Sequence, residues 1–175
     1  MSHNPMDAIF IPQLIQAPER TEEIQVQEFL PGLDTLTPVR GIVRVRHCGN
    51  YLEVTAKAEA IITCSCCRCL KQFNHRLVVD TSEIIWLDEA ANQFDDLPLE
   101  REVAVEDLVE SLLPQGHFYP SEWLYEQMCL EIPPRQLCDQ ACAGIQTTAK
   151  STISENPLVD KRWASLEALK KQLPN

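Results

Sequence analysis

The clearest pattern in the chain is a two-residue alternation of apolar and polar side chains on both sides of Gly49-Asn50. Such a dipeptide closes β-hairpins, so it predicts strands over 42–48 and 51–64. The hairpin register then places Arg46 opposite Glu53. We expect the apolar side chains to share one buried face and the charged ones to lie on the exposed face opposite. The predicted core positions are Val43, Val45, Leu52, Val54, Ala56, Ala58, Ala60 and Ile62.

Further elements are predicted on both sides of this hairpin. Residues 76–87 form a third long strand in this interpretation, and 8–15 add a further one. Apolar residues recur at helical spacing over 105–112, 121–130 and 160–173, which predicts helices there. Strands followed by helices, joined by hairpins, predict an α+β fold. Its sheet should be mostly antiparallel, with C-terminal helices, and stapled by one structural zinc.

We expect three segments along the chain. They are an N-terminal strand with a polar lead-in (1–36), an α+β domain that carries metal-binding cysteines (37–142), and a linker with an amphipathic C-terminal helix (143–175).

Charge narrows the possible partners. The chain of 175 residues has 15 basic and 26 acidic residues, for a formal net charge of −11. Residues 83–132 hold 13 acidic residues and one basic residue, so this acidic block carries 1 − 13 = −12. Such a protein is not drawn to phosphate backbones or anionic lipid in general. A protein partner is therefore expected first, and the alternative is that the carboxylates are solvated surface.

Cysteine content suggests a metal rather than disulfides. The first residues carry no signal-peptide pattern, and no apolar run approaches the length of a membrane span. We therefore expect a cytoplasmic location, which is a reducing compartment. Eight cysteines there favour metal binding.

Two cysteine pairs are spaced like zinc ligands. Cys66 and Cys69 are three positions apart, and Cys138 and Cys142 are four apart. Four thiolates close a tetrahedral site and leave no open position, so one structural zinc per chain is predicted. The exact choice of ligands stays open, because Cys64 or Cys67 could replace one of the named cysteines, and His75 could also serve as a ligand. Cys48 and Cys129 are expected to be packing residues.

The same motifs resemble a known family. Cys66-Cys67-Arg68-Cys69-Leu70 resembles the CxRCL element of the YceD family. Leu124-Tyr125-Glu126-Gln127 looks like its L-x-E-Q stretch, and Leu137-Cys138 like the LC that follows a proline. Cys142-Ala143-Gly144 completes a C-x3-C-x-G, and 160–169 resembles the D-x-R-x3-L-x2-L helix near the family's end. The resemblance covers roughly 35–170.

This resemblance implies a role in the accumulation or processing of large-subunit (23S) ribosomal RNA in bacteria and plastids, within ribosome assembly. It implies no catalytic activity. The expected partner is a ribosomal protein or another ribosome-assembly component, with no membrane and no small-molecule substrate. Many members have a further cysteine pair after the glycine, whereas this chain reads Ile145-Gln146-Thr147-Thr148, which favours a single metal site.

Two other functions are considered. Direct binding of ribosomal RNA would use the basic residues beside the first cysteine pair, Arg68, Lys71 and Arg76. The alternative is an acidic protein-interaction adaptor without direct RNA contact. Catalysis is not expected, because the adjacent carboxylates Asp95 and Asp96 lack a supporting histidine or lysine and no glycine-rich phosphate loop is present.

Overall fold

The computed structural model describes residues 6–89, 91 and 110–145. The first elements are the short strand β1 (Ile9–Phe10), helix α1 (Ile11–Leu14) and the 3-10 turn η1 (Pro18–Arg20). Four long strands follow, β2 (Thr21–Glu28), β3 (Val39–His47), β4 (Tyr51–Ser65) and β5 (Gln72–Leu87). The last elements are β6 (Ser111–Leu112), β7 (His117–Phe118) and helix α2 (Pro120–Leu130).

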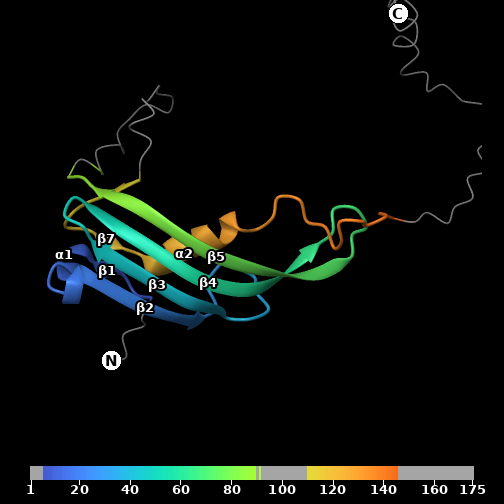
Figure 1. Cartoon of the computed structure of the whole chain (residues 1–175), viewed down its shortest axis with the longest axis horizontal. Coiled ribbons are helices and arrows are strands. Elements are labelled where there is room, and N and C mark those ends of the chain that lie inside the picture. Colours follow the sequence, from blue (N-terminus) through green and yellow to red (C-terminus); the bar gives the residue numbers. More distant parts are fainter. Residues whose placement is uncertain (1–5, 90, 92–109, 146–175) are drawn as a thin grey trace, which may run out of the picture. The chain divides into compact units, whose positions relative to one another are not determined.

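The long strands form one five-stranded sheet in the order β2-β3-β4-β5-β6 (Figure 1). All its pairs are antiparallel except β5 with β6, and β1 pairs separately with β7. The described part is thus mostly β-sheet with a helix near its C-terminal end. This confirms the predicted antiparallel sheet and the predicted helix over 121–130, which begins one residue earlier, at Pro120.

The predicted hairpin is confirmed in its register. Arg46 pairs with Glu53, and Cys48 N–H donates to the Tyr51 carbonyl oxygen at 2.9 Å across the turn. All eight predicted core positions are buried. They face α1 and α2, whose buried side chains include Ile11, Leu14, Trp123, Leu124 and Met128. Alternation alone therefore identified the inner face of the sheet.

Glu83 ties α2 to β5 from this inner face. Its carboxylate Oε2 accepts hydrogen bonds from Trp123 Nε1 at 2.6 Å and from Gln127 Nε2 at 3.1 Å. These two hydrogen bonds replace the water that the carboxylate loses when it is partly buried. The contact fixes the helix from which the chain returns to the cysteine-rich turn.

Two predictions need correction, and one strand was not predicted at all. The strand expected over 8–15 is wrong beyond Phe10, because Pro12 lies in the first turn of α1, where its missing N–H costs nothing. Strand β2 was not predicted, since only Ile24 and Val26 interrupt its polar sequence. Leu112, expected in a helix, lies in β6 and accepts a hydrogen bond from Asp88 N–H at 2.9 Å.

Some expectations fall outside the described residues. These are most of the helix over 105–112, the C-terminal helix over 160–173, and most of the linker before it. The proposed boundaries after residues 36 and 142 stay predictions, and Met6, Ile9 and Leu30 of the first segment belong to the same core as the sheet.

Candidate metal centre

The first cysteine pair lies in the turn between β4 and β5. Cys66 directly follows β4, and its N–H donates to the Lys71 carbonyl oxygen at 2.9 Å. The Leu70 N–H donates back to the Cys66 carbonyl oxygen, also at 2.9 Å. Leu70 adopts the left-handed region, with φ of 62°, which turns the chain into β5. This compact turn places the Cys66 and Cys69 side chains on the same side.

The second pair arrives from α2, whose following segment reaches the β4–β5 turn (Figure 1). Gln136 docks that segment, because its carbonyl oxygen accepts from Cys67 N–H at 2.8 Å and its side-chain Oε1 accepts from Ser65 N–H at 3.2 Å. Asp139 then forms a tight turn by accepting from Ala141 N–H at 2.7 Å and from Cys142 N–H at 3.1 Å. Sequence reasoning missed both supporting residues, and the polar spacing between the cysteines was the signal for a turn.

The four sulfur atoms converge. Cys66 Sγ lies 3.8 Å from Cys142 Sγ, and Cys69 Sγ lies 3.6 Å from Cys138 Sγ. All four sulfurs lie within 4.8 Å of one another. Tetrahedral coordination with Zn–S bonds of about 2.3 Å would separate the sulfurs by about 3.8 Å. A disulfide would require about 2.05 Å. The spacing therefore suits a metal ion held by four cysteines.

Electrostatics in the cluster favours a cation. Backbone N–H groups of Cys138 and then Cys69 stabilise the Cys66 thiolate and lower its pKa to about 6, although burial opposes this. The neighbouring Cys69 side chain, followed by those of Cys142 and Cys66, raises the pKa of Cys138 to about 12. Four adjacent sulfurs cannot all ionise without a positive charge among them. A divalent cation held between the sulfurs would supply that charge.

Arg68 joins the two cysteine segments. Its Nη1 donates to the Cys142 carbonyl oxygen at 3.1 Å and to the Gln140 carbonyl oxygen at 3.4 Å. Gly144 passes close to the same residue, because a Cβ at that position would lie 3.5 Å from the Arg68 carbonyl oxygen. The side chain predicted to touch RNA thus contacts the chain's own second cysteine turn.

The structure brings together the four cysteines that the spacing predicted and separates them from the open alternatives. Cys64 is buried at the end of β4, where burial raises its pKa, and Cys67 is exposed. His75 lies on β5 opposite Ile62. Among the described residues, no other group of cysteine, histidine or carboxylate side chains has a spacing that suits a metal.

The other predicted contact residues lie on the exposed side of the chain. Arg76 on β5 forms an ion pair with Glu59 of β4, and both side chains are about half exposed. Lys71 is exposed at the end of the cysteine turn. RNA contact by these residues and Arg68 stays a prediction.

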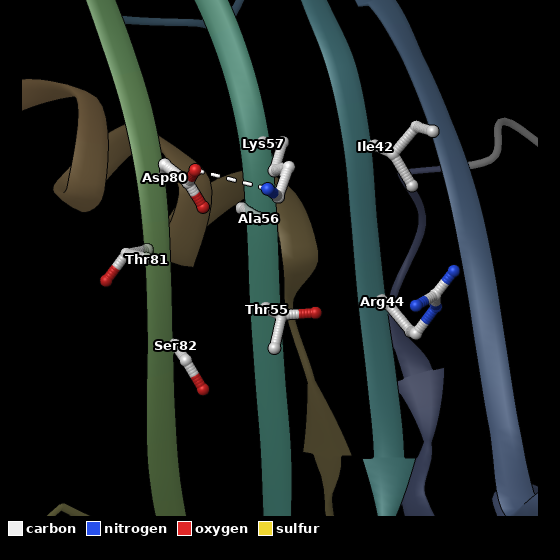
Figure 2. Close-up of a pocket in the computed structure, with 8 residues that line it drawn as sticks. All are labelled: Ile42, Arg44, Thr55, Ala56, Lys57, Asp80, Thr81 and Ser82. Carbon is white, nitrogen blue, oxygen red and sulfur yellow. Dashed lines mark ion pairs between the residues drawn. The ribbon is translucent and has the colours of Figure 1, made fainter.

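A shallow hollow on the outer face of the sheet shows no convergent chemistry (Figure 2). Lys57 Nζ pairs with Asp80 Oδ2 at 3.2 Å, and Arg44 Nη2 pairs with Glu23 Oε2 at 2.6 Å. Its remaining lining includes Ile42, Thr55 and Ser82. The charged side chains of the hollow thus form ion pairs with side chains of adjacent strands. Within 6–89, 91 and 110–145, no helix has the length and apolar character that a membrane span requires.

Comparison with known proteins identifies the family. Residues 54–170 match the family model described as large ribosomal RNA subunit accumulation protein YceD. No curated protein and no solved structure gave a match. The match begins within β4 and includes both cysteine pairs, so the candidate metal centre lies inside the region that defines the family. The chain therefore belongs to the YceD family.

Proposed function

We propose that the chain is a non-catalytic, zinc-binding factor that supports the accumulation and processing of 23S ribosomal RNA and the assembly of the large ribosomal subunit in the cytoplasm. The observation that carries this proposal is the family match over residues 54–170, which cover both cysteine pairs. The family's description names large ribosomal RNA subunit accumulation. The four-cysteine cluster supports a metal-dependent fold for that role.

Zinc is the metal that best suits four thiolates in a reducing compartment. It binds cysteine sulfur in closed tetrahedral sites and needs no redox chemistry. With Cys66, Cys69, Cys138 and Cys142 as ligands, no coordination position remains for water or substrate. The ion would therefore stabilise the fold and would not act in a reaction.

The proposed ion would fasten the segment after α2 to the β4–β5 turn. Two hydrogen bonds that Gln136 accepts already join these parts, but most of the segment is exposed. Exposed hydrogen bonds contribute little net stability, because water competes for the same groups. Metal binding would therefore decide whether this end of the protein is ordered for a partner.

A depletion experiment in the source organism tests the function. Loss of the protein should lower 23S ribosomal RNA relative to 16S ribosomal RNA, and the wild-type chain should restore the ratio. Cys66→Ser should fail to restore it, whereas Cys67→Ser should succeed, because Cys67 is adjacent but lies outside the sulfur cluster. An unchanged ratio after complete depletion would reject the proposed function.

The absence of catalysis is part of this proposal. It is supported by two observations. Four cysteine ligands would leave no open position on the metal, and the charged side chains at the outer-face hollow are already ion-paired. Purified, metal-loaded protein should leave ribosomal RNA intact in the presence of Mg²⁺. Cleavage that depends on the protein and survives further purification would contradict it.

A second candidate is an acidic protein-interaction adaptor that does not touch RNA. It is favoured by the acidic block, and by the contacts of Arg68 and Arg76 with the chain's own oxygen atoms. Salt-sensitive capture of a purified ribosomal protein, with no RNA affinity, would favour this adaptor. RNA affinity that falls steeply with salt and is lost when Arg68, Lys71 and Arg76 are replaced by alanine would favour direct RNA binding.

A further inference from the structure

Among the residues that the structure describes, the outer edge of β5 has almost no strand partner. β5 is 16 residues long and pairs with β4 along nearly all of its length. On its other side, β6 pairs only with Trp86 and Leu87. Along Gln72–Ile85, no residue in the described ranges forms a strand on that side. Figure 1 shows β5 as the last long strand of the sheet.

Hydrogen bonds at the end of β5 show which residues face the open edge. Leu87 N–H donates toward β4, to the Asn50 carbonyl oxygen at 2.9 Å, whereas Trp86 N–H donates away from it, to the Glu110 carbonyl oxygen at 3.0 Å. Backbone groups alternate sides along an antiparallel strand, and the β4–β5 register is unbroken. The residues whose N–H and C=O face outward are therefore Asn74, Arg76, Val78, Asp80, Ser82 and Ile84.

This edge also exposes large apolar side chains. Val78 is 51% exposed and Ile84 52%. Long open edges are usually protected by charge or proline, because an apolar edge recruits another strand. The opposite edge, β2, is rich in charged and amide side chains and exposes no large hydrophobic residue. The two edges of the sheet thus differ in their readiness to accept a strand.

Negative charge surrounds one end of the edge. Glu110 precedes β6, and partial burial together with the carboxylates of Glu83 and Glu126 raises its pKa. Glu122 and Glu126 line a cavity with Glu110 beside α2. Between residues 88 and 145, Arg135 is the single lysine or arginine among the residues described. A strand that carries lysine or arginine would complement this charge, whereas a second copy would bring two chains of net charge −11 together.

We propose that the open edge of β5 binds an extended, basic segment of a partner protein by strand addition. This inference rests on the proposed function, because it assigns the surface through which the assembly factor would hold a basic ribosomal protein. Main-chain hydrogen bonds from the outward residues would supply affinity. Apolar side chains of the partner would cover Val78 and Ile84, and its basic side chains would reach Glu110 and Glu126.

A peptide experiment tests the edge directly. The probe is a short synthetic peptide of alternating lysine and valine, added to full-length metal-loaded protein. Its control keeps the lysines but has proline in place of valine, so it has equal charge and cannot form a strand. Amide hydrogen exchange should slow at Val78, Asp80, Ser82 and Ile84 with the first peptide alone. Protection at β2 instead, or no protection at β5, would overturn the proposal.

Two variants test the mode of binding. Ser82→Pro removes an outward N–H and leaves the ladder with β4 intact, so peptide affinity should fall by about tenfold. Ile84→Lys should weaken binding similarly. Its matched control is Ile42→Lys, on the same face but inside the sheet, where the exposed fraction is 37%. Equal weakening by Ile84→Lys and Ile42→Lys would contradict strand addition even if the proline variant fails to fold.

Two further outcomes separate this inference from its alternatives. Protection of β5 that grows with protein concentration in the absence of peptide would identify a second copy as the occupant and overturn the proposal. Cells that carry Ile84→Lys should show a lowered 23S to 16S ratio. A normal ratio in these cells would reject the edge as the functional surface, whereas a normal ratio without any of the protein would reject the proposed function itself.

Discussion

Arg68 provides the sharpest test of how the candidate metal centre is built. Its guanidinium spans the two cysteine segments through hydrogen bonds of 3.1 Å to the Cys142 carbonyl oxygen and 3.4 Å to the Gln140 carbonyl oxygen. Only the shorter distance lies in the usual range for N–H···O bonds. We therefore count one charge-assisted hydrogen bond. Because water competes for this exposed side chain, we take its contribution to stability from the low end of the usual range, about 1.5 kcal/mol.

This magnitude predicts the effect of Arg68→Ala on metal affinity. Loss of about 1.5 kcal/mol from the arrangement proposed to bind the metal corresponds to roughly tenfold weaker binding. Competition against a chromophoric chelator measures the affinity. The matched control is Lys71→Ala, which removes the same charge three residues away and should have little effect. Arg68→Lys should lie between them, because an ammonium on a flexible stem can reach the Cys142 carbonyl oxygen but is less fixed in position than a guanidinium.

Two results would contradict this role of Arg68. Equal weakening in Arg68→Ala and Lys71→Ala would mean that net charge near the sulfurs matters and the hydrogen bonds do not. Unchanged affinity in Arg68→Ala would mean that the two cysteine turns hold their positions without the arginine.

Three further predictions concern the sheet and its acidic end. Gly41→Ala should destabilise the protein by about 2–3 kcal/mol in urea unfolding, because a Cβ there would lie 2.2 Å from the Lys57 carbonyl oxygen; unchanged or higher stability would contradict this. Trp123→Phe should cost about 1–2 kcal/mol by removing the 2.6 Å donor to Glu83, and a neutral effect would contradict it. The raised pKa of Glu110 means that the folded state binds its proton more tightly than the unfolded state, so this group lowers stability as pH rises above its ordinary pKa. Glu110→Gln should therefore raise the melting temperature at pH 7 but not in acid, and the reverse would contradict the sign.

Local pattern predicted the centre of the fold well and its edges poorly. The loop at Gly49-Asn50 fixes the hairpin register, and an alternation that agrees with it leaves one choice of inner face. β2 was missed because an edge strand buries only Ile24 and Val26, too few to produce an alternating signal. β6 has only two residues and is a strand because of its hydrogen bonds with β5. Such long-range contacts leave no local pattern in the sequence.

The clustering of the four cysteines was predictable because zinc-binding chemistry ties cysteines to particular spacings. Cys66 and Cys69, like Cys138 and Cys142, sit at separations that one turn can bring together. Spacing alone could not choose between Cys66 and its neighbours Cys64 and Cys67. The end of β4 decides this, since Cys64 points into the core and Cys67 is exposed. The support from Gln136 and Arg68 depends on contacts between distant segments, so it required the structure.

Elemental analysis of the purified protein measures directly whether the two distant cysteine pairs hold one metal ion. The protein should be prepared under reducing conditions, together with Cys66→Ser, Cys138→Ser and the control Cys67→Ser. We expect one zinc per chain in the wild type and the control, and its loss in both ligand variants with a fall in thermal stability. Wild-type protein that is well folded without bound metal, or ligand variants that retain a full equivalent of zinc, would contradict it.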